Sequence, residues 1–480
     1  MGTRSCHTNS RSFRSTLGIL RRRVGLMSAL GLFVAVSGCA TVDPTPDYEW
    51  AREEVKAGTG EDTLYQPGEE EEAQERVGEL LKGGLTSSEA VQICLLNNRS
   101  IQDQLFEIGV SRADAVQAGL LSNPSLEALI RFPVGGGSTN TEAGLLQNLI
   151  ELWHLPGRRR LAESQLEQTV LEVAHLAVGL AAQAKSAYFS AVAAGEALAV
   201  AEENFRTAQE FLELTLERQE AGASTQVDVN AARSRFLEQQ VFVRSTRFAA
   251  IEAKRRLALV LGLAVPAQEI GLAGPPLAPP EWTVDLASLL SAAGQYRLDL
   301  RAAKKSVKAA ENALPLERRR ILRNVSVGVA LESEGGETAL GPAIELEIPI
   351  FDQNQAQIAK AEYRYAQAVR RLQSASTQAA QQVRGAFERY AMAQEVARLY
   401  QTELLPLREA SLELARESFA AGKTGFLSVL EAQDRLLVTR REYVERLEAV
   451  ALSIPGLEAA CGRPLAVLLG TSETGRARDE

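Results

Sequence analysis

Long helical patterns dominate the chain. Along residues 166–212, apolar residues recur at alternating spacings of four and three, which is an unbroken heptad seam. A second apolar stripe over residues 171–199 widens this face enough to contact two neighbouring helices. No proline interrupts residues 157–222, so at about 1.5 Å per residue the predicted helix reaches roughly 100 Å. The pattern returns over residues 353–421, where Pro406 is expected to kink the helix.

Four short segments follow a different period. Apolar and polar residues alternate in them, so each predicts a strand with one apolar and one wet face. Their bounds are about 125–132, 142–152, 325–332 and 342–350. Glycine-rich residues 133–141 and turn-rich residues 333–341 join the strands into two hairpins. Asn148 interrupts the apolar side of the second segment, which is therefore the weakest of the four strands.

Strands of about nine to eleven residues fit a transmembrane β-barrel, whose outside meets lipid and whose lumen is polar. Trp153 and Phe351 then lie at matching strand ends, where an aromatic girdle forms. Four strands cannot close a barrel; because barrels begin at about eight strands, two chains are the minimum and three give about twelve strands. The alternative is a pair of hairpins packed on a soluble core. In a barrel, the acids on the lumenal faces are Glu127, Glu332, Glu345 and Glu347.

The chain repeats itself at an offset of 200 or 201 residues. The residues around Gly222 correspond to those around Gly422, and Gly262 corresponds to Gly462. Two copies of one unit therefore follow each other. The predicted boundaries are 39–84 for a polar tether, 85–280 for the first repeat with long helices at about 157–220 and 224–262, 281–470 for the second repeat with long helices at about 353–421 and 425–453, and 471–480 for a tail.

The N-terminus predicts export. Six arginines precede an apolar run over residues 24–36, which has the length of a signal-peptide core and is too short to span a bilayer. The run ends in Val36-Ser37-Gly38-Cys39, which resembles a bacterial lipobox. Residues 1–38 are thus a predicted lipoprotein signal peptide, and Cys39 is the predicted lipidation site. An ordinary cleavage site followed by an unrelated cysteine is the alternative.

Charge and composition exclude several functions. Lys+Arg 52 against Asp+Glu 61 gives a net charge of -9, without a basic patch, which argues against nucleic-acid binding. Loss of the signal, with its six arginines and no acid, makes the exported chain still more acidic. Three histidines without clustered ligands predict no metal site and no cofactor, and without a nucleophile paired with a base we expect no enzyme. Cys94 and Cys461 form either a disulfide or two buried thiols.

Together, these features resemble the outer-membrane efflux protein family of TolC-like outer membrane factors. The resemblance rests on the lipobox, the duplicated units of helix, hairpin and very long helix, and the turns around Gly222 and Gly422. The junction at residues 155–160 and the turn at residues 421–427 look most like the lipoprotein branch that serves heavy-metal and drug RND efflux pumps.

The resemblance implies a mainly α fold with a small β part, in which a homotrimer forms an α-barrel and a 12-stranded transmembrane β-barrel. It implies a passive conduit in the bacterial outer membrane, lipid-anchored and integral, extending into the periplasm. Its partners would be outer-membrane lipid, a periplasmic membrane-fusion adaptor and an inner-membrane transporter of RND type. The implied adaptor-contact residues are Arg218, Gly222, Ser418 and Gly422, and the implied acids of a periplasmic constriction are Asp228 and Glu431.

Two other readings stay open. The chain could be a periplasmic coiled-coil adaptor or structural lipoprotein, since long apolar seams suit those proteins as well. It could also be an outer-membrane channel for type I protein secretion, because the residues do not identify the cargo.

Overall fold

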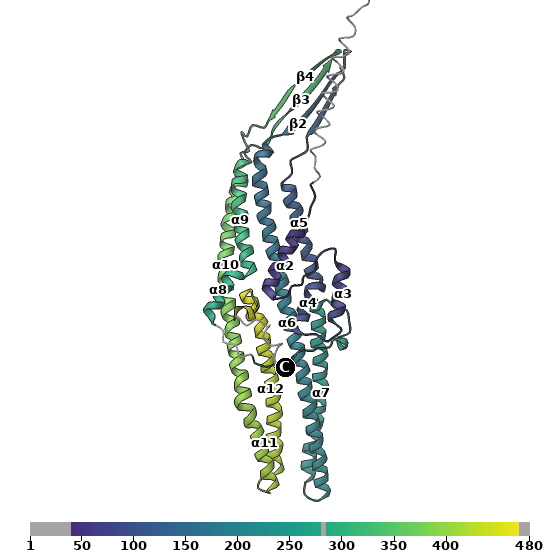
Figure 1. Ribbon diagram of the computed structural model, residues 1–480, viewed down its shortest axis with the longest axis vertical. Helices are drawn as coiled ribbons and strands as arrows, with labels where there is room; N and C mark the ends of the chain where they lie inside the picture. The colour runs from purple at the N-terminus through teal and green to yellow at the C-terminus, as the bar shows by residue number, and fades with distance from the viewer. Residues whose placement is uncertain (1–39, 280–284, 470–480) are drawn as a thin grey trace, which may run out of the picture. The chain divides into compact units, whose positions relative to one another are not determined.

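The computed structural model describes residues 40–279 and 285–469, so the predicted signal peptide, Cys39 and the tail at 471–480 lie outside the described residues. Most of the described chain is helical, with one small antiparallel sheet (Figure 1). The elements are α2 Thr45–Thr59, α3 Glu70–Leu80, α4 Ser87–Asn97, α5 Arg99–Ala118, β1 Ser125–Arg131, β2 Asn140–Asn148, α6 Ile150–Glu220, α7 Gln226–Leu261, a 3-10 turn Ala267–Glu269, α8 Leu286–Tyr296, α9 Leu298–Arg319, β3 Val325–Glu334, β4 Glu337–Leu346, α10 Gln355–Leu399, a π-helical turn Tyr400–Leu404, α11 Leu405–Ala420, α12 Phe426–Cys461 and α13 Leu465–Leu468.

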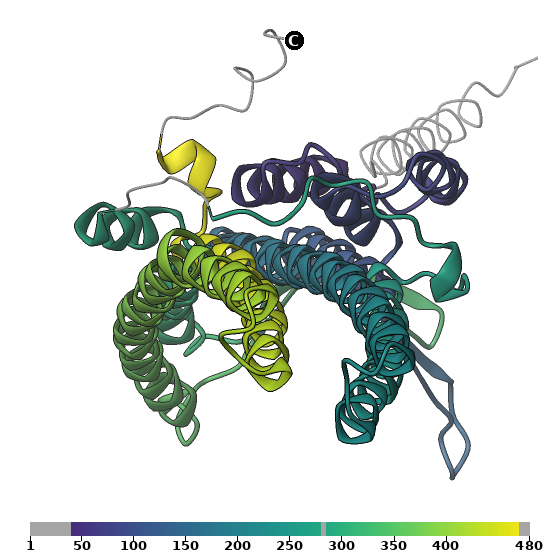
Figure 2. The same ribbon diagram turned by 90° about the horizontal axis from the view of Figure 1, so that it is seen from below.

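Within residues 44–469, the long helices lie side by side in one layer (Figures 1 and 2). Nearest the sheet, α9 packs between α6 and α10, and α5 packs on the other side of α6. Farther from the sheet, α12 takes the place of α9 and α7 takes the place of α5. The predicted heptad seam supplies this packing, because Val170, Ala177 and Ala184 on α6 are almost fully buried. In the described chain, no helix contains an apolar stretch of the length that crosses a bilayer.

The segment predicted as a polar tether is instead folded. Helix α2 lies against α6, with Ala51 and Val55 completely buried. Its acids are held by arginines from distant helices: Arg112 makes two hydrogen bonds to Asp47, and Arg301 makes two to Glu54. The prediction failed because the acidic composition of this stretch hides a short helical apolar stripe at spacings of three and four.

The two hairpins differ from their predicted bounds. The strand predicted at 142–152 is β2, Asn140–Asn148, because residues from Ile150 onward already belong to α6. The strand predicted at 342–350 is β4, Glu337–Leu346. Glu334 pairs with Glu337 across a two-residue turn, Gly335-Gly336, in which both φ angles are positive. Two adjacent glycines permit this tight turn, whose backbone matches the twist of the strands, so the long predicted loop becomes strand.

The predicted helices are present, with shifted ends. Helix α6 begins at Ile150, so Pro156 lies inside it and leaves the carbonyl of Leu152 without its usual backbone donor. The kink expected at Pro406 is a π-helical turn, Tyr400–Leu404, directly before α11. Helix α12 continues through Pro455 to Cys461 rather than ending near 453.

The duplication is visible at the ends of α7 and α12. Gly262 and Gly462 each cap their helix with a left-handed backbone, φ 69° and 76°. At each helix end, a side chain from about 165 residues earlier in the sequence donates hydrogen bonds to the last backbone carbonyls. Asn97 donates to the carbonyls of Leu261 and Gly262, and Arg297 donates to the carbonyl of Ala460. We call these two arrangements the Asn97 clasp and the Arg297 clasp.

Candidate functional site

The sheet is a meander in which β1, β2, β3 and β4 are neighbours in that order, all antiparallel. Directly paired residues share a face, and side chains alternate between faces along each strand. The register therefore places Glu127, Glu332 and Glu345 on one face of the sheet. Glu347 lies just past the end of β4, and its backbone N–H donates to the carbonyl of Asn324, which precedes β3.

Further polar residues join this face. Glu142 pairs with Glu332 in the register and is bound by Arg131 from β1. The side-chain amide of Asn140 donates to Glu332 at 3.1 Å, and that of Asn324 donates to Glu345 at 3.0 Å. Sequence reasoning missed Glu142, although its alternation with Ala143 and Gly144 was a usable signal. Glu142, Glu332 and Glu345 thus lie in a hydrogen-bonded polar surface rather than as isolated charges.

The opposite face of the sheet is apolar and exposed in the single chain. Leu126 is 76% exposed and Ile344 is 75% exposed. Seven further large side chains on this face are also exposed, namely Ile130, Leu145, Val327, Val329, Leu331, Leu340 and Leu346. A soluble hairpin would bury such a face on a core. Within the described residues, no helix covers it (Figure 1).

The turns that end the two helical hairpins have the same backbone. In the first tip, the N–H groups of Gly222 and Ala223 donate to the carbonyls of Gln219 and Arg218. In the second tip, those of Gly422 and Lys423 donate to Phe419 and Ser418. This pair of bonds is a Schellman motif, which requires a left-handed residue. Gly222 and Gly422 supply it with φ 74° and 69°, as the sequence predicted.

The tips differ in how the next helix begins. At the first tip, Thr225 and Asp228 form a capping box: the Thr225 N–H donates to Asp228 Oδ2 at 2.8 Å, and the Asp228 N–H donates to Thr225 Oγ1 at 3.2 Å. Hydrogen bonds from the Thr225 side chain and backbone lower the pKa of Asp228. At the second tip, Gly425 occupies the cap and offers no side chain.

Asp228, one of the two predicted constriction acids, thus uses its carboxylate to accept hydrogen bonds from Thr225 in the cap of α7. Glu431 lies exposed on α12. The structure joins the two tips through other residues: the guanidinium of Arg218 lies over the ring of Phe419, 4.5 Å from its centroid. Ser418 holds the position equivalent to Arg218 in the second repeat, so this contact has no counterpart there.

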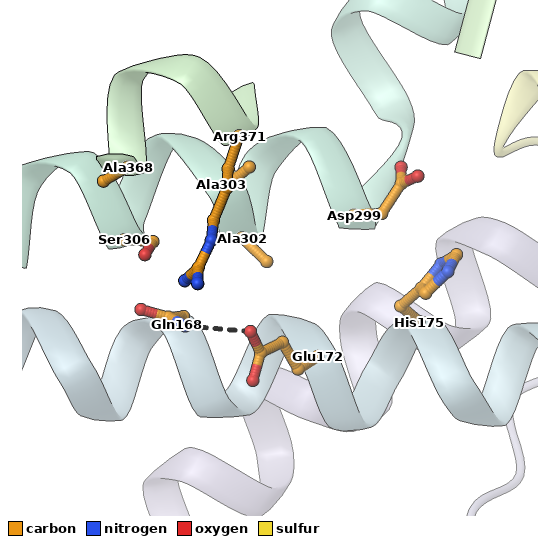
Figure 3. A pocket seen from close by; sticks show the side chains of 9 residues that line it. All are labelled: Gln168, Glu172, His175, Asp299, Ala302, Ala303, Ser306, Ala368 and Arg371. Atoms are coloured by element: carbon orange, nitrogen blue, oxygen red, sulfur yellow. Dashed lines mark hydrogen bonds between the residues drawn. The ribbon is translucent and has the colours of Figure 1, made fainter. Parts of the chain in front are cut away.

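A polar hollow of about 260 Å³ lies where α6, α9 and α10 meet (Figure 3). Arg371 extends from α10 toward Gln168 and Glu172 on α6, and Gln168 donates to Glu172 at 2.9 Å. Burial opposes ionisation of Asp299 at the other end of the hollow, but hydrogen bonds and charge from Arg297 outweigh it and lower the pKa of Asp299. The lining residues come from three distant segments, so no local sequence signal predicted the hollow.

The two cysteines are not bonded to each other. Both are completely buried free thiols, and burial raises the pKa of each to about 12. Cys94 lies in the core around α2, α4 and α6, whereas Cys461 lies in a separate core with Leu289 and Val383. Of the two alternatives left open by the sequence, the structure has the two buried thiols and not the disulfide. Residues 40–279 and 285–469 contain no group of three or more His, Cys, Asp or Glu side chains that could hold a metal ion.

Long helices in one layer with a four-stranded meander are the fold of solved outer-membrane channels. The chain is similar to a membrane protein from Pseudomonas aeruginosa, with a TM-score of 0.65 and 19% identity over 78% of this chain and 92% of that chain. It is similar to the outer membrane protein VceC from Vibrio cholerae, with a TM-score of 0.64 and 17% identity over 82% of this chain and 97% of that chain. It is also similar to the CmeC outer membrane channel from Campylobacter jejuni, with 0.64 and 15% over 84% and 89%.

At these identities, the likeness establishes a common fold. Residues 289–463 match the family model described as outer membrane efflux protein, and the family resemblance predicted from the sequence is confirmed. The match covers most of the second repeat. No curated protein sequence matches the chain. Neither the family match nor the solved structures point to an enzyme family.

Proposed function

We propose that this protein is the outer-membrane channel of a tripartite efflux system. Three copies form a passive conduit that receives small solutes or metal ions from an inner-membrane transporter of RND type through a periplasmic adaptor. The proposal rests on the observation that a single copy of the chain leaves strand edges and apolar surfaces uncovered, both in the sheet and in the helical layer. Its sheet has two unpaired edges and an uncovered apolar face, and its helical layer has two ends with uncovered apolar seams.

The sheet supports contact with lipid. Its apolar face presents large aliphatic side chains and its other face presents Glu127, Glu332 and Glu345. This alternation is what a barrel strand needs when lipid lies outside and water inside. Strands β1 and β4 are the free edges, so β4 of one copy can pair with β1 of the next. Three copies then close a barrel of twelve strands, and its acidic lumen carries polar solutes without desolvation.

The helical layer supports contact with further copies. At one end, α7 exposes Val227, Val241 and Phe248, which lie on one face at heptad spacing. At the other end, α10 and α11 expose apolar residues at spacings of seven and eight, namely Met392, Leu399, Leu407 and Leu414. These two seams complement each other as the halves of a helix interface. The conduit therefore continues from the sheet into a helical tube.

The remaining assignments follow from the family resemblance. Lipidation of Cys39 would anchor the N-terminus in the outer membrane. The tips at Arg218 and Gly222, and at Ser418 and Gly422, would contact the adaptor. Asp228 and Glu431 would line the periplasmic constriction, although the hydrogen bonds of Asp228 in its capping box give it a second, structural role.

The assembly can be tested with Val241→Glu, which places a charge in the α7 seam. We expect wild-type protein reconstituted in lipid vesicles to be trimeric by native mass spectrometry and to conduct ions across a planar bilayer. Val241→Glu should lower the trimer fraction at least tenfold, because an unpaired charge would be buried at the interface. Gln240→Glu adds the same charge beside the seam and should leave the trimer intact. A wild-type chain that stays monomeric and passes no current would overturn the proposal.

A further inference from the structure

Arginines gather at the junction between the helices and the sheet. The start of α6, the end of α9 and the segment before β3 contribute Arg158, Arg159, Arg160, Arg318, Arg319, Arg320 and Arg323. We call this set the arginine collar. His154 on α6 lies 3.2 Å from the carbonyl of Arg319, and Gly157 lies close to Leu316, so the two helix ends are side by side. The sequence alone indicated no basic patch, because these arginines lie in two segments about 160 residues apart that only the fold brings together.

Intramolecular pairing does not use the whole collar. Five of its arginines have one acidic partner each, at Glu151, Glu163, Glu362, Glu317 and Asp352. Most of these pairs are exposed, including Arg159 with Glu163, and such pairs are weak and readily exchanged. Among the described residues, the guanidinium groups of Arg160 and Arg319 have no acidic partner. The collar therefore carries excess positive charge that is available to an external anion.

Exposed apolar residues adjoin the collar. Leu149 precedes α6 as its N-cap residue, Leu152 and Trp153 follow it at spacings of three and four, and each of the three is about half exposed. Arg160 lies seven residues after Trp153, two turns farther along the same face. In the second repeat, Ile350 and Phe351 follow β4, and Phe351 is 91% exposed. An apolar band with Trp and Phe, followed within about 10 Å by arginines, is the profile of a bilayer interface.

We propose that the arginine collar binds the phosphates of anionic phospholipids in the leaflet that faces the periplasm. This inference rests on the proposed placement of the sheet in the outer membrane. Guanidinium groups suit the ligand because their planar forks bind phosphate oxygens in a bidentate manner. The neighbouring aliphatic and aromatic side chains suit the acyl chains of the same lipid. A soluble phosphorylated partner would not need that apolar band.

Both repeats contribute to this surface, with three of the seven arginines in the first repeat and four in the second. Arg158-Arg159-Arg160 corresponds to Ile358-Ala359-Lys360 in the second repeat, which keeps one cation of three. Each copy of the chain therefore presents one collar, where the start of α6 meets the end of α9. An experiment can therefore monitor lipid binding at the start of α6.

Trp153 can report on the lipid beside α6. Trp50→Phe and Trp282→Phe leave it as the single tryptophan of the full-length chain. The trimeric protein would be reconstituted in phosphatidylethanolamine vesicles that contain brominated phosphatidylglycerol or brominated phosphatidylcholine at equal mole fraction, and quenching of Trp153 fluorescence would be measured. We expect phosphatidylglycerol to bind about fivefold more tightly, the preference expected from about one arginine near the surface.

Arg159→Gln/Arg160→Gln should reduce this preference below about twofold. Arg233→Gln/Arg244→Gln removes the same charge from exposed positions on α7 and should leave it unchanged. Equal quenching by the two lipids in the wild type would overturn the inference and leave the channel intact. Quenching by neither lipid would mean that the junction does not meet a bilayer, and would overturn the proposed function as well. A preference that survives 20 mM inorganic phosphate but not Arg159→Gln/Arg160→Gln would identify the lipid, rather than free phosphate, as the ligand.

Discussion

The two repeats have one plan but hold it together with different chemistry. In the first, the neutral Asn97 clasp receives the end of α7 with two hydrogen bonds to backbone carbonyls. In the second, the Arg297 clasp does the same for α12, and the guanidinium, only 7% exposed, needs Asp299 as a counter-ion. A duplicated backbone thus preserves the geometry of a joint while its charge changes. The first joint does not titrate, whereas the second depends on a carboxylate.

The long helices that lead to the two tips also differ between the repeats. Helix α6 runs without interruption to the first tip, where Thr225 and Asp228 cap the returning helix. The second repeat reaches its tip through a π-helical turn at Tyr400–Leu404, and Gly425 leaves the returning helix without a side-chain cap. Since each missing cap or helical bond lowers local stability, the second tip should open more readily than the first.

The largest effect is expected at the helix-end glycines. In Gly262→Ala, the new Cβ would lie 2.7 Å from the Asn97 carbonyl oxygen, and in Gly462→Ala it would lie 3.0 Å from the Arg297 backbone. We expect the free energy of unfolding to fall by about 3 kcal/mol in Gly262→Ala and by about 2 kcal/mol in Gly462→Ala, because each alanine adds a steric clash and a strained left-handed backbone. Gly222→Ala has the same positive φ but open space around it, and should cost only about 1 kcal/mol. Thermal unfolding in detergent would rank the three; equal losses would mean that the clasps are not tightly packed.

The next effect separates the clasps by pH. Arg297→Gln leaves Asp299 without its counter-ion and should lower the free energy of unfolding by about 2 kcal/mol at pH 7. The pKa of Asp299 is lowered in the folded chain, so its stabilising effect is complete above its unfolded pKa, about 4, and disappears as pH falls through the folded pKa. The difference in melting temperature between wild type and Arg297→Gln should therefore shrink below about pH 4.

Asn97→Ala is the matched change in the first repeat. It should cost about 1 to 2 kcal/mol at every pH, because an amide does not titrate. Melting curves of both variants between pH 3 and 7 would compare the clasps. A gap for Arg297→Gln that stays constant down to pH 3 would contradict the role given to Asp299.

The smallest effect concerns the tips. Thr225→Ala removes the capping box of α7 and should cost about 1 kcal/mol locally, so amide exchange in the first turn of α7 should rise about fivefold. Gly425→Thr supplies a cap to α12 and should slow exchange there by less than about twofold, because glycine is itself a tolerable cap. Hydrogen exchange with mass spectrometry would read both turns. Slower exchange at the start of α12 than at the start of α7 in the wild type would contradict the expectation that the second tip opens more readily.

Sequence periodicity predicted most of the fold. The long helices follow from apolar residues spaced at three and four, and the common face of Glu127, Glu332 and Glu345 follows from alternation in the strands. The glycines at 222 and 422 were predictable because a tight helix end needs a left-handed residue. Such features depend on short stretches of chain, where local patterns decide the structure.

Features that depend on long-range contacts were not predictable. The helix α2 was taken for a tether because its stability comes from packing on α6 and from Arg112 and Arg301, which lie far away in the sequence. A disulfide between Cys94 and Cys461 was plausible because these two cysteines make an even pair in the exported chain. The fold instead places the two thiols in separate cores. The hollow around Arg371 likewise exists only where three distant helices meet.

The burial of Cys94 and Cys461 makes the folded chain chemically quiet toward thiol reagents. With the pKa of each thiol raised to about 12, almost no thiolate exists near neutral pH, and neither sulfur is accessible. Maleimide labels or crosslinkers directed at a cysteine engineered into the tips or the α7 seam would therefore meet no competing reaction from these two positions.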